Sequence, residues 1–228
     1  MPNKKILGTI ATTKYGIEFK STSECRMFEL LMEAGFNPEY EPATYKLTNS
    51  FRPTVPFFKR KGKGIKSAFV YDMSKVPSIS YTPDFSFMYN NIFVIIECKG
   101  YENDVYPYKR ILFRALLESY NTPVMFFQVQ TMRELKDSII KIKMESDLLS
   151  KIRKKIIALP AKDIPIANRY LDSRDWESLD SLVSSAIKRV NNSRSNRARE
   201  SSKLLYKDID ITELEDLNMM LFQYMSKL

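Results

Sequence analysis

Apolar and polar positions alternate between strand-like and helix-like patterns through the first 130 residues. Apolar residues at helical spacing predict helices at residues 22–34, which Gly35 follows, and at residues 108–120. Short apolar or alternating runs predict strands at residues 17–20, 40–47, 67–72, 79–88, 92–99 and 122–129. Strands interspersed with helices in this way predict an α/β or α+β core with a mixed sheet.

The strand signals fade in the last hundred residues, where helical periods take their place. Helices are predicted at residues 135–159, 176–190 and 212–225. We therefore expect two parts, a core at residues 1–130 and a helical C-terminal region at residues 131–228.

Basic residues concentrate in three places that an anionic partner could contact. The first is a basic insertion at residues 49–66, broken by prolines and glycines, with Lys59, Arg60, Lys61, Lys63 and Lys66. The second is the predicted helix 108–120, with Lys109, Arg110 and Arg114. The third is the polar stretch 191–202, with Arg194, Arg197 and Arg199. Flexible cations suit phosphate contacts, but a solvated loop, a solvated helix surface or an exposed linker explains the same residues.

The composition favours a nucleic-acid partner and narrows the chemistry. The chain has 36 Lys and Arg against 27 Asp and Glu, a formal net charge of +9 that fits a polyanion such as DNA. It has no histidine, which excludes Ser–His and Cys–His nucleophile pairs, His-ligated zinc and a histidine general base. Cys25 and Cys98 suggest neither a disulfide framework nor a zinc site. Catalysis must therefore depend on carboxylates, lysine, tyrosine or a metal ion.

The sequence predicts a protein of the cell interior. Its first residues lack the long apolar core and the cleavage site of a signal peptide. No apolar run approaches the ~18 residues that cross a bilayer. Two cysteines without a disulfide pattern fit a reducing compartment. We expect no membrane association and a cytoplasmic location, which is the host cytoplasm if a phage encodes the chain.

The strands on either side of Asn90 and Asn91 are predicted to form a hairpin. Asparagine tolerates positive φ, so this pair suits a tight turn. Antiparallel pairing about the turn places Asp84 directly opposite Glu97, with Cβ atoms about 4.5–5.5 Å apart on one face. Lys99 lies two residues beyond Glu97 and projects from the same face.

These charges predict a metal site. Two carboxylates at ~4 Å repel by about 4 kcal/mol at an effective dielectric near 20, and a divalent cation removes that penalty. Magnesium prefers oxygen ligands, and Lys99 could orient or deprotonate the attacking water or neutralise charge on a phosphate. Alternatively, both carboxylates lie on a solvated face and pair with Lys99. The apolar run 94–96 favours the first reading, because a strand buried on both faces makes an isolated carboxylate costly.

Polar residues outside the hairpin are candidates for the same site. Glu24 lies on the apolar stripe of its helix, within about 60° of Met27 and Phe28. A capping box with Ser21 also explains Glu24, and the two roles are compatible. Gln128 and Gln130, which end the last core strand, either support the site or simply end the strand.

The order Pro83-Asp84, then Glu97-Cys98-Lys99, resembles the motif of the PD-(D/E)XK nuclease superfamily. The resemblance extends to segment 15–21, Glu24, Gly35-Phe36 and Tyr40-Glu41-Pro42. This wider order is similar to phage endonuclease I, of the Holliday-junction resolvase type, and to nucleases that cleave transposon ends. It covers residues 14–130, and the insertion 49–66 departs from it.

The resemblance implies a restriction-endonuclease-like mixed sheet flanked by helices, and DNA cleavage with Mg²⁺ or Mn²⁺. Asp84 and Glu97 would bind the metal, Lys99 would be the catalytic lysine, and Glu24 would be the catalytic and metal-binding carboxylate of the first helix. Glu41 matches a further metal-binding position, although an exposed strand carboxylate is as good an account of it.

The expected function is a magnesium-dependent endonuclease that resolves branched DNA such as Holliday junctions. A homodimer is expected because cutting two strands needs two sites. One alternative is a nuclease of restriction, homing or transposition type that cuts defined duplex sites. The other is a catalytically silent nucleic-acid-binding or assembly protein on the same fold.

Overall fold

The computed structural model describes residues 11–62, 67–100, 104–120, 122–195 and 198–226. Within them the fold mixes seven helices with several small sheets, which confirms the predicted class at the level of α and β content. The strands are β1 Thr12–Lys14, β2 Ile17–Phe19, β3 Glu39–Tyr40, β4 Tyr45–Lys46, β5 Phe58–Lys61, β6 Ala68–Tyr71, β7 Ser80–Tyr81, β8 Phe85–Tyr89, β9 Ile92–Cys98 and β10 Val124–Val129. The helices are α1 Thr22–Glu33, α2 Tyr106–Leu117, α3 Met132–Ile156, α4 Ile164–Asp172, α5 Trp176–Ser193, α6 Glu200–Leu205 and α7 Ile211–Met225.

The central sheet has four strands in the order β10-β9-β8-β3. β9 is antiparallel to β8 and parallel to β10, so the sheet is mixed, as predicted. An inner strand with packing on both faces needs apolar residues at consecutive positions. This explains the apolar run of β9, in which Val94, Ile95 and Ile96 are fully buried.

The hairpin between β8 and β9 has the predicted register. Asn90 and Asn91 form its turn with φ of 46° and 66°. Phe85 pairs with Ile96, and the pairing runs through to the turn. A two-residue turn of positive-φ residues permits only one pairing register of the two strands. The turn therefore fixes which residues share a face of the sheet.

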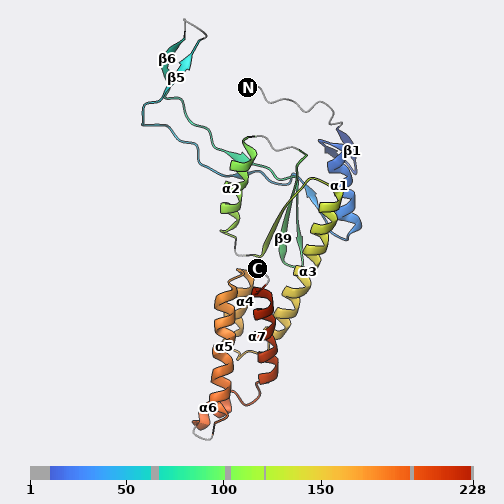
Figure 1. The fold of residues 1–228 in the computed structure, drawn as a ribbon, viewed down its shortest axis with the longest axis vertical. Helices are drawn as coiled ribbons and strands as arrows, with labels where there is room; N and C mark the ends of the chain where they lie inside the picture. Colours follow the sequence, from blue (N-terminus) through green and yellow to red (C-terminus); the bar gives the residue numbers. More distant parts are fainter. Residues whose placement is uncertain (1–10, 63–66, 101–103, 121, 196–197, 227–228) are drawn as a thin grey trace.

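The two faces of β9 pack against different helices. Val94 and Ile96 share one hydrophobic core with residues of α1 and α3. Ile95 belongs to a second core with Phe113 and Leu117 of α2. Figure 1 shows α2 on one side of the sheet and α1 and α3 on the other. Side chains alternate along a strand, so Glu97 lies on the α2 side with Ile95.

Three predictions of local structure were wrong in detail. The segment 79–88 is not one strand, because residues 82–84 separate β7 from β8. The segment 40–47 is not one strand, because Glu41 with φ of 45° and the following Pro42 separate β3 from β4. The insertion 49–66 is not wholly irregular, because β5 pairs with β6 as an antiparallel ribbon. Residues 63–66 of that insertion lie outside the described residues.

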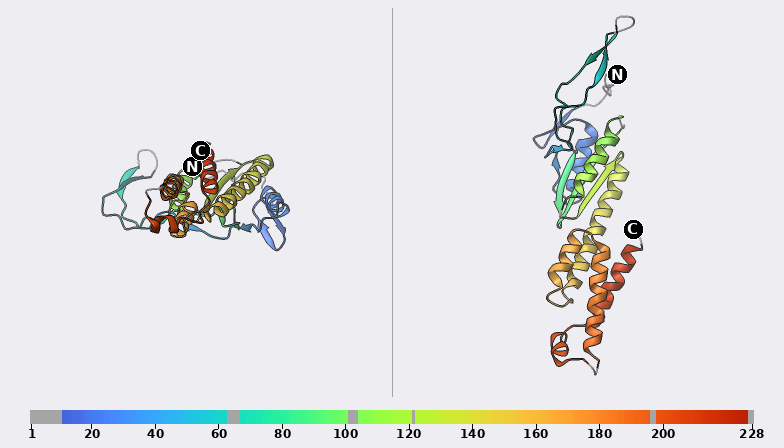
Figure 2. Two further views of the ribbon diagram at one scale, coloured as in Figure 1. Left: turned by 90° about the horizontal axis from the view of Figure 1, so that it is seen from below. Right: turned by 90° about the vertical axis from the view of Figure 1, so that its left-hand side faces the viewer.

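The C-terminal helices continue the packing of the sheet. The first half of α3 buries Leu135 and Ile142 in the same core as the sheet, and its second half buries Ile152 and Ile156. Figures 1 and 2 show α3 running from the sheet toward α4–α7 at the opposite end of the molecule. The short helices α4 and α6 were not predicted. Within the described ranges, no helix combines the length and apolar character that crossing a membrane requires.

Candidate functional site

Three of the predicted site residues come together where β9 ends and β8 begins. Asp84 immediately precedes β8, and its Oδ2 accepts a hydrogen bond of 2.6 Å from the backbone N–H of Cys98. Glu97 precedes Cys98 on β9, and Lys99 follows it just beyond the end of the strand. The backbone N–H of Lys99 donates to Val129 of β10 at 2.8 Å, which holds the end of the motif to the sheet.

Glu97 is a buried carboxylate with two donors. Its side chain is 3% exposed, which excludes the alternative of a solvated position. Tyr81 Oη donates to Oε2 at 2.6 Å, and Lys99 Nζ donates to Oε1 at 2.9 Å. Lys99 Nζ also lies 4.4 Å from the ring centroid of Tyr106, a cation–π distance. The lysine is thereby held between a carboxylate and an aromatic face.

The pKa of the Asp84 carboxyl is raised in this arrangement. Burial raises its pKa to about 8, and the charges of Glu97 and Glu24 add to the shift. The Cys98 N–H and Lys99 oppose the shift without cancelling it. The site therefore holds more carboxylates than its own cations neutralise, which favours a further positive charge there.

Cys98 packs against the hydrophobic core. It joins the core on the face opposite Glu97, and its Sγ lies 2.9 Å from Met27 Sδ of α1. Burial, followed by the charge of Asp84, raises the pKa of the thiol above its usual range, so Cys98 stays neutral.

Glu24 caps α1, as one of its two predicted roles requires. It lies in the first turn of α1, where its backbone N–H donates to the N-cap hydroxyl of Ser21 at 3.2 Å. Its carboxylate accepts from Ser21 Oγ at 2.9 Å, from Lys20 N at 3.2 Å and from Tyr40 Oη at 2.5 Å. Its charge also contributes to the raised pKa of Asp84, so it faces the site.

Glu41 lies beside the site, where its backbone and its carboxylate both make contacts. Its N–H donates to the carbonyl of Asp84 at 2.8 Å, and its carboxylate pairs with Lys20. Partial burial lowers the pKa of Lys20, but Glu41, Asp84 and Glu24 together raise it above its ordinary value. Lys20 is thus a cation of the site that the sequence analysis missed.

The aromatic partners of the site were also missed. Tyr81, Tyr106 and Tyr40 each contact a charged site residue. The only sequence signal was proximity, since Tyr81 stands three residues before Asp84. Their contacts depend on the placement of β7, α2 and β3, which the local pattern does not specify.

The donor chemistry of Asp84 and Glu97 fits a hard divalent cation such as Mg²⁺, which prefers carboxylate oxygens. Among the described residues, no group of three or more carboxylates or thiols is gathered closely enough to hold a metal ion. The hydrogen bonds of Glu24 and the ion pair of Glu41 hold those carboxylates in place. Glu24 and Glu41 as metal ligands stay predictions.

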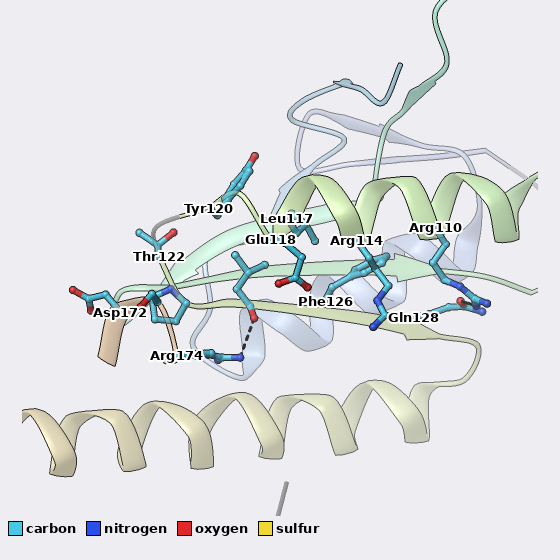
Figure 3. A pocket seen from close by; sticks show the side chains of 13 residues that line it. Arg110, Arg114, Leu117, Glu118, Tyr120, Thr122, Phe126, Gln128, Asp172 and Arg174 are labelled. Atoms are coloured by element: carbon cyan, nitrogen blue, oxygen red, sulfur yellow. Dashed lines mark hydrogen bonds between the residues drawn. The ribbon is translucent and has the colours of Figure 1, made fainter. Parts of the chain in front are cut away.

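Two of the predicted DNA contacts line a cavity next to the site. The cavity has a volume of about 710 Å³ and extends along α2 and β10, with Arg110, Arg114 and Gln128 in its lining. Arg110 Nη1 donates to Gln128 Oε1 at 2.6 Å, and Gln128 is the register partner of Glu97. Figure 3 shows these two side chains at one end of the cavity and Arg174 toward the other. Gln128 therefore lies on the strand position next to Glu97, whereas Lys109 does not line this cavity.

The predicted cations of β5, and those at the end of α5 and the start of α6, lie farther from the sheet. Lys59, Arg60 and Lys61 are exposed on β5, and Lys59 pairs with Asp72. Lys63, Lys66 and Arg197 are outside the described residues. Arg194 Nη2 donates to the carbonyl of Ile209 at 2.9 Å, and Arg199 is the N-cap residue of α6. Residues 191–193 belong to α5, and Arg194 is its C-cap residue.

Comparison with protein-family models, with curated proteins and with solved structures found no match for this chain. The family resemblance therefore rests on the residues of the motif and on the site they form.

Replacing Glu24 with glutamine is expected to lower DNA cleavage by about a hundredfold or more, because a charge next to the site is lost. Glutamine keeps the capping-box side chain, so the free energy of unfolding should change by only a few tenths of a kcal/mol. Cleavage rates and thermal unfolding of the purified variant measure the two effects. Glu33→Gln, on an exposed position of the same helix, is the matched control. A large drop in melting temperature with full cleavage below it would leave only the capping role.

Proposed function

We propose that the chain is a magnesium- or manganese-dependent DNA endonuclease with a core of the PD-(D/E)XK type. The observation that carries the proposal is the group of Asp84, buried Glu97 and Lys99 at the end of the central strand. A buried carboxylate pair is costly to fold, and it persists where the surplus negative charge has a use. The order of the motif along the chain supports the same proposal.

Each residue of the group has a role in phosphodiester hydrolysis. The divalent cation supplies charge that polarises the phosphate and lowers the pKa of a bound water. Asp84 and Glu97 would hold it, with the backbone of Cys98 orienting Asp84 and Tyr81 orienting Glu97. Lys99 is restrained by Glu97 and by the ring of Tyr106, so its ammonium stays beside the carboxylates, where it would orient an attacking water or neutralise charge on a phosphate.

The arginine-lined cavity supports DNA as the substrate. Arg110, Arg114 and Arg174 lie along it, and the hydrogen bond from Arg110 to Gln128 connects it to Glu97. Cations spaced along a groove that leads from the reacting centre suit a phosphate backbone. The net charge of +9 favours the same partner.

We propose branched DNA as the substrate and a homodimer as the active form, because resolving a junction requires two cuts. The test is a cleavage assay on linear, nicked and four-way-junction DNA with Mg²⁺, Mn²⁺ or EDTA. We expect cleavage with either cation, fastest on the junction, and none with EDTA. Absence of cleavage on all three DNAs with both cations would reject the nuclease proposal. Equal rates on the three DNAs would reject the junction preference alone.

Arg114→Ala is expected to weaken DNA binding without changing the cleavage rate at saturating DNA. Arg114 is exposed on α2 and lines the cavity, so its loss removes one phosphate contact. The slope of log affinity against log salt should then fall by about 0.9 on duplex DNA. Lys188→Ala, an exposed cation on α5, is the control and should leave the slope unchanged. An unchanged slope in the Arg114 variant as well would place the DNA elsewhere.

A further inference from the structure

The β5–β6 ribbon stands apart from the packed part of the molecule. Figures 1 and 2 show it extending beyond the end of the sheet at which α2 begins, while α4–α7 lie at the opposite end. The ribbon has two strands, and every residue of both is exposed. An isolated two-stranded hairpin is only marginally stable in water, so burial does not explain its apolar side chains.

One face of the ribbon is aromatic. Phe58 pairs with Tyr71 and Arg60 with Phe69, and these neighbouring pairs share a face because side chains alternate along a strand. The rings of Phe58 and Tyr71 are 5.4 Å apart, and the guanidinium of Arg60 lies 5.8 Å from the Phe69 centroid. Phe58, Phe69 and Tyr71 are 56%, 70% and 54% exposed. Three large rings next to one another in water mark a binding surface.

The charges of the ribbon indicate what binds there. Lys59, Arg60 and Lys61 stand on β5 itself, and Asp72, directly after β6, pairs with Lys59. Arg60 and Lys61 have no acidic partner among the ion pairs of the described residues. Rings interleaved with cations match a ligand that combines flat apolar rings with negative charge. Unpaired nucleotides have this combination, since their bases stack on aromatic side chains and their phosphates pair with cations.

Fully paired duplex DNA does not suit this surface. Its bases are stacked on one another inside the helix, so duplex offers phosphates and groove edges to the ribbon but no free ring face. Strand ends, flaps, gaps and the open centre of a junction do expose ring faces. The position of the ribbon, beyond the end of the sheet that carries Asp84, Glu97 and Lys99, places such bases on the side of the molecule where cleavage is proposed.

We propose that the β5–β6 ribbon is a stacking platform for unpaired bases, with Phe58, Phe69 and Tyr71 contacting the rings and Arg60 and Lys61 the phosphates. This deepens the proposed nuclease function and rests on it for its biological use. The proposed substrate is therefore DNA that has unpaired bases close to the cut. The β5–β6 ribbon, which lies outside the catalytic group, would select this substrate.

The test measures binding without cleavage. Fluorescence anisotropy in EDTA compares a labelled oligo-dT with an abasic oligonucleotide of the same length. The variants are Phe69→Ala with Tyr71→Ala, and Phe69→Leu with Tyr71→Leu, which keeps apolar side chains if the alanines loosen the ribbon. Phe222→Ala is the control, since Phe222 is a 71% exposed ring on α7.

The wild type should bind oligo-dT at least about tenfold more tightly than the abasic strand, because stacking contributes about 1–3 kcal/mol per base. Both double variants should lose that preference and keep the affinity for the abasic strand, with an unchanged salt slope. Phe222→Ala should behave as wild type. Equal wild-type affinity for the two strands, or an undiminished preference in both double variants, would overturn the proposal.

Two further measurements test whether the ribbon is instead a dimer interface and whether base binding is independent of cleavage. Sedimentation equilibrium of wild type and double variants without DNA reports self-association through the ribbon. A wild-type dimer that dissociates in the variants, with the oligo-dT preference retained, would make the platform a dimer interface and overturn the proposal. Asp84→Asn should keep the oligo-dT preference, so a failure of base binding and a failure of cleavage are observed independently.

Discussion

Replacing Asp84 with asparagine, or Glu97 with glutamine, is expected to reduce DNA cleavage by about a thousandfold or more. Each substitution removes a carboxylate of the pair that the proposed cation would neutralise, and the several kcal/mol of transition-state stabilisation from that charge are lost. DNA binding should stay intact or improve, because each substitution removes a carboxyl group that repels the phosphates when it is ionised. Steady-state cleavage and filter binding on the same DNA measure the two effects.

The matched control for these variants is Glu215→Gln, a charge-neutralising change at an exposed position of α7. It should cleave as wild type does. Thermal unfolding must show that each variant is folded at the assay temperature. Cleavage at the wild-type rate by a folded Asp84 or Glu97 variant would remove that residue from the mechanism.

The hairpin at the centre of the site was predictable because its information is local. Asn90 and Asn91 permit a tight turn, and the turn fixes the register that brings Asp84 to the end of β9. The apolar run before Glu97 indicated a strand buried on both faces, and Glu97 is indeed buried. Both inferences need only the sequence of one hairpin.

The rest of the site could not be predicted because its contacts join distant parts of the chain. Lys20 reaches Glu41 across 21 positions, and Tyr81 reaches Glu97 across 16. These contacts depend on where β3 and β7 end, and each of those strands has only two residues. Strands of two residues leave almost no periodic signal, so the sequence pattern did not reveal them.

The ribbon was missed for a different reason. Its first strand, β5, consists of Phe58 followed by three consecutive cations, and it has no alternation of apolar and polar residues. Alternation is the signal of a half-buried strand, and this strand is exposed on both faces. The absence of the pattern therefore reflects the exposed setting of β5, which also makes its aromatic residues available to a partner.

Without divalent cations, the free energy of unfolding is expected to fall as the pH rises from the ordinary aspartate pKa of 3.8 to about 8. The folded state keeps the proton of Asp84 over this range, whereas the unfolded state loses it, and so stability falls with rising pH. Below that range Asp84 is protonated in both states and contributes nothing. Above pH 8 the free energy of unfolding falls no further on account of Asp84, because the carboxyl has then ionised beside Glu97 in the folded state as well.

Asp84→Asn should remove this pH dependence, since asparagine has no proton to lose. At pH 8 the metal-free variant should have a higher free energy of unfolding, and so a higher melting temperature, than the wild type. Magnesium should raise the melting temperature of the wild type at pH 8 by binding the folded state, and it should have little effect on the variant. Calorimetry between pH 4 and 8, with EDTA or with Mg²⁺, makes both comparisons. Parallel stability curves for wild type and variant would show that Asp84 ionises normally, and the argument for a cation at this carboxylate pair would lose its electrostatic basis.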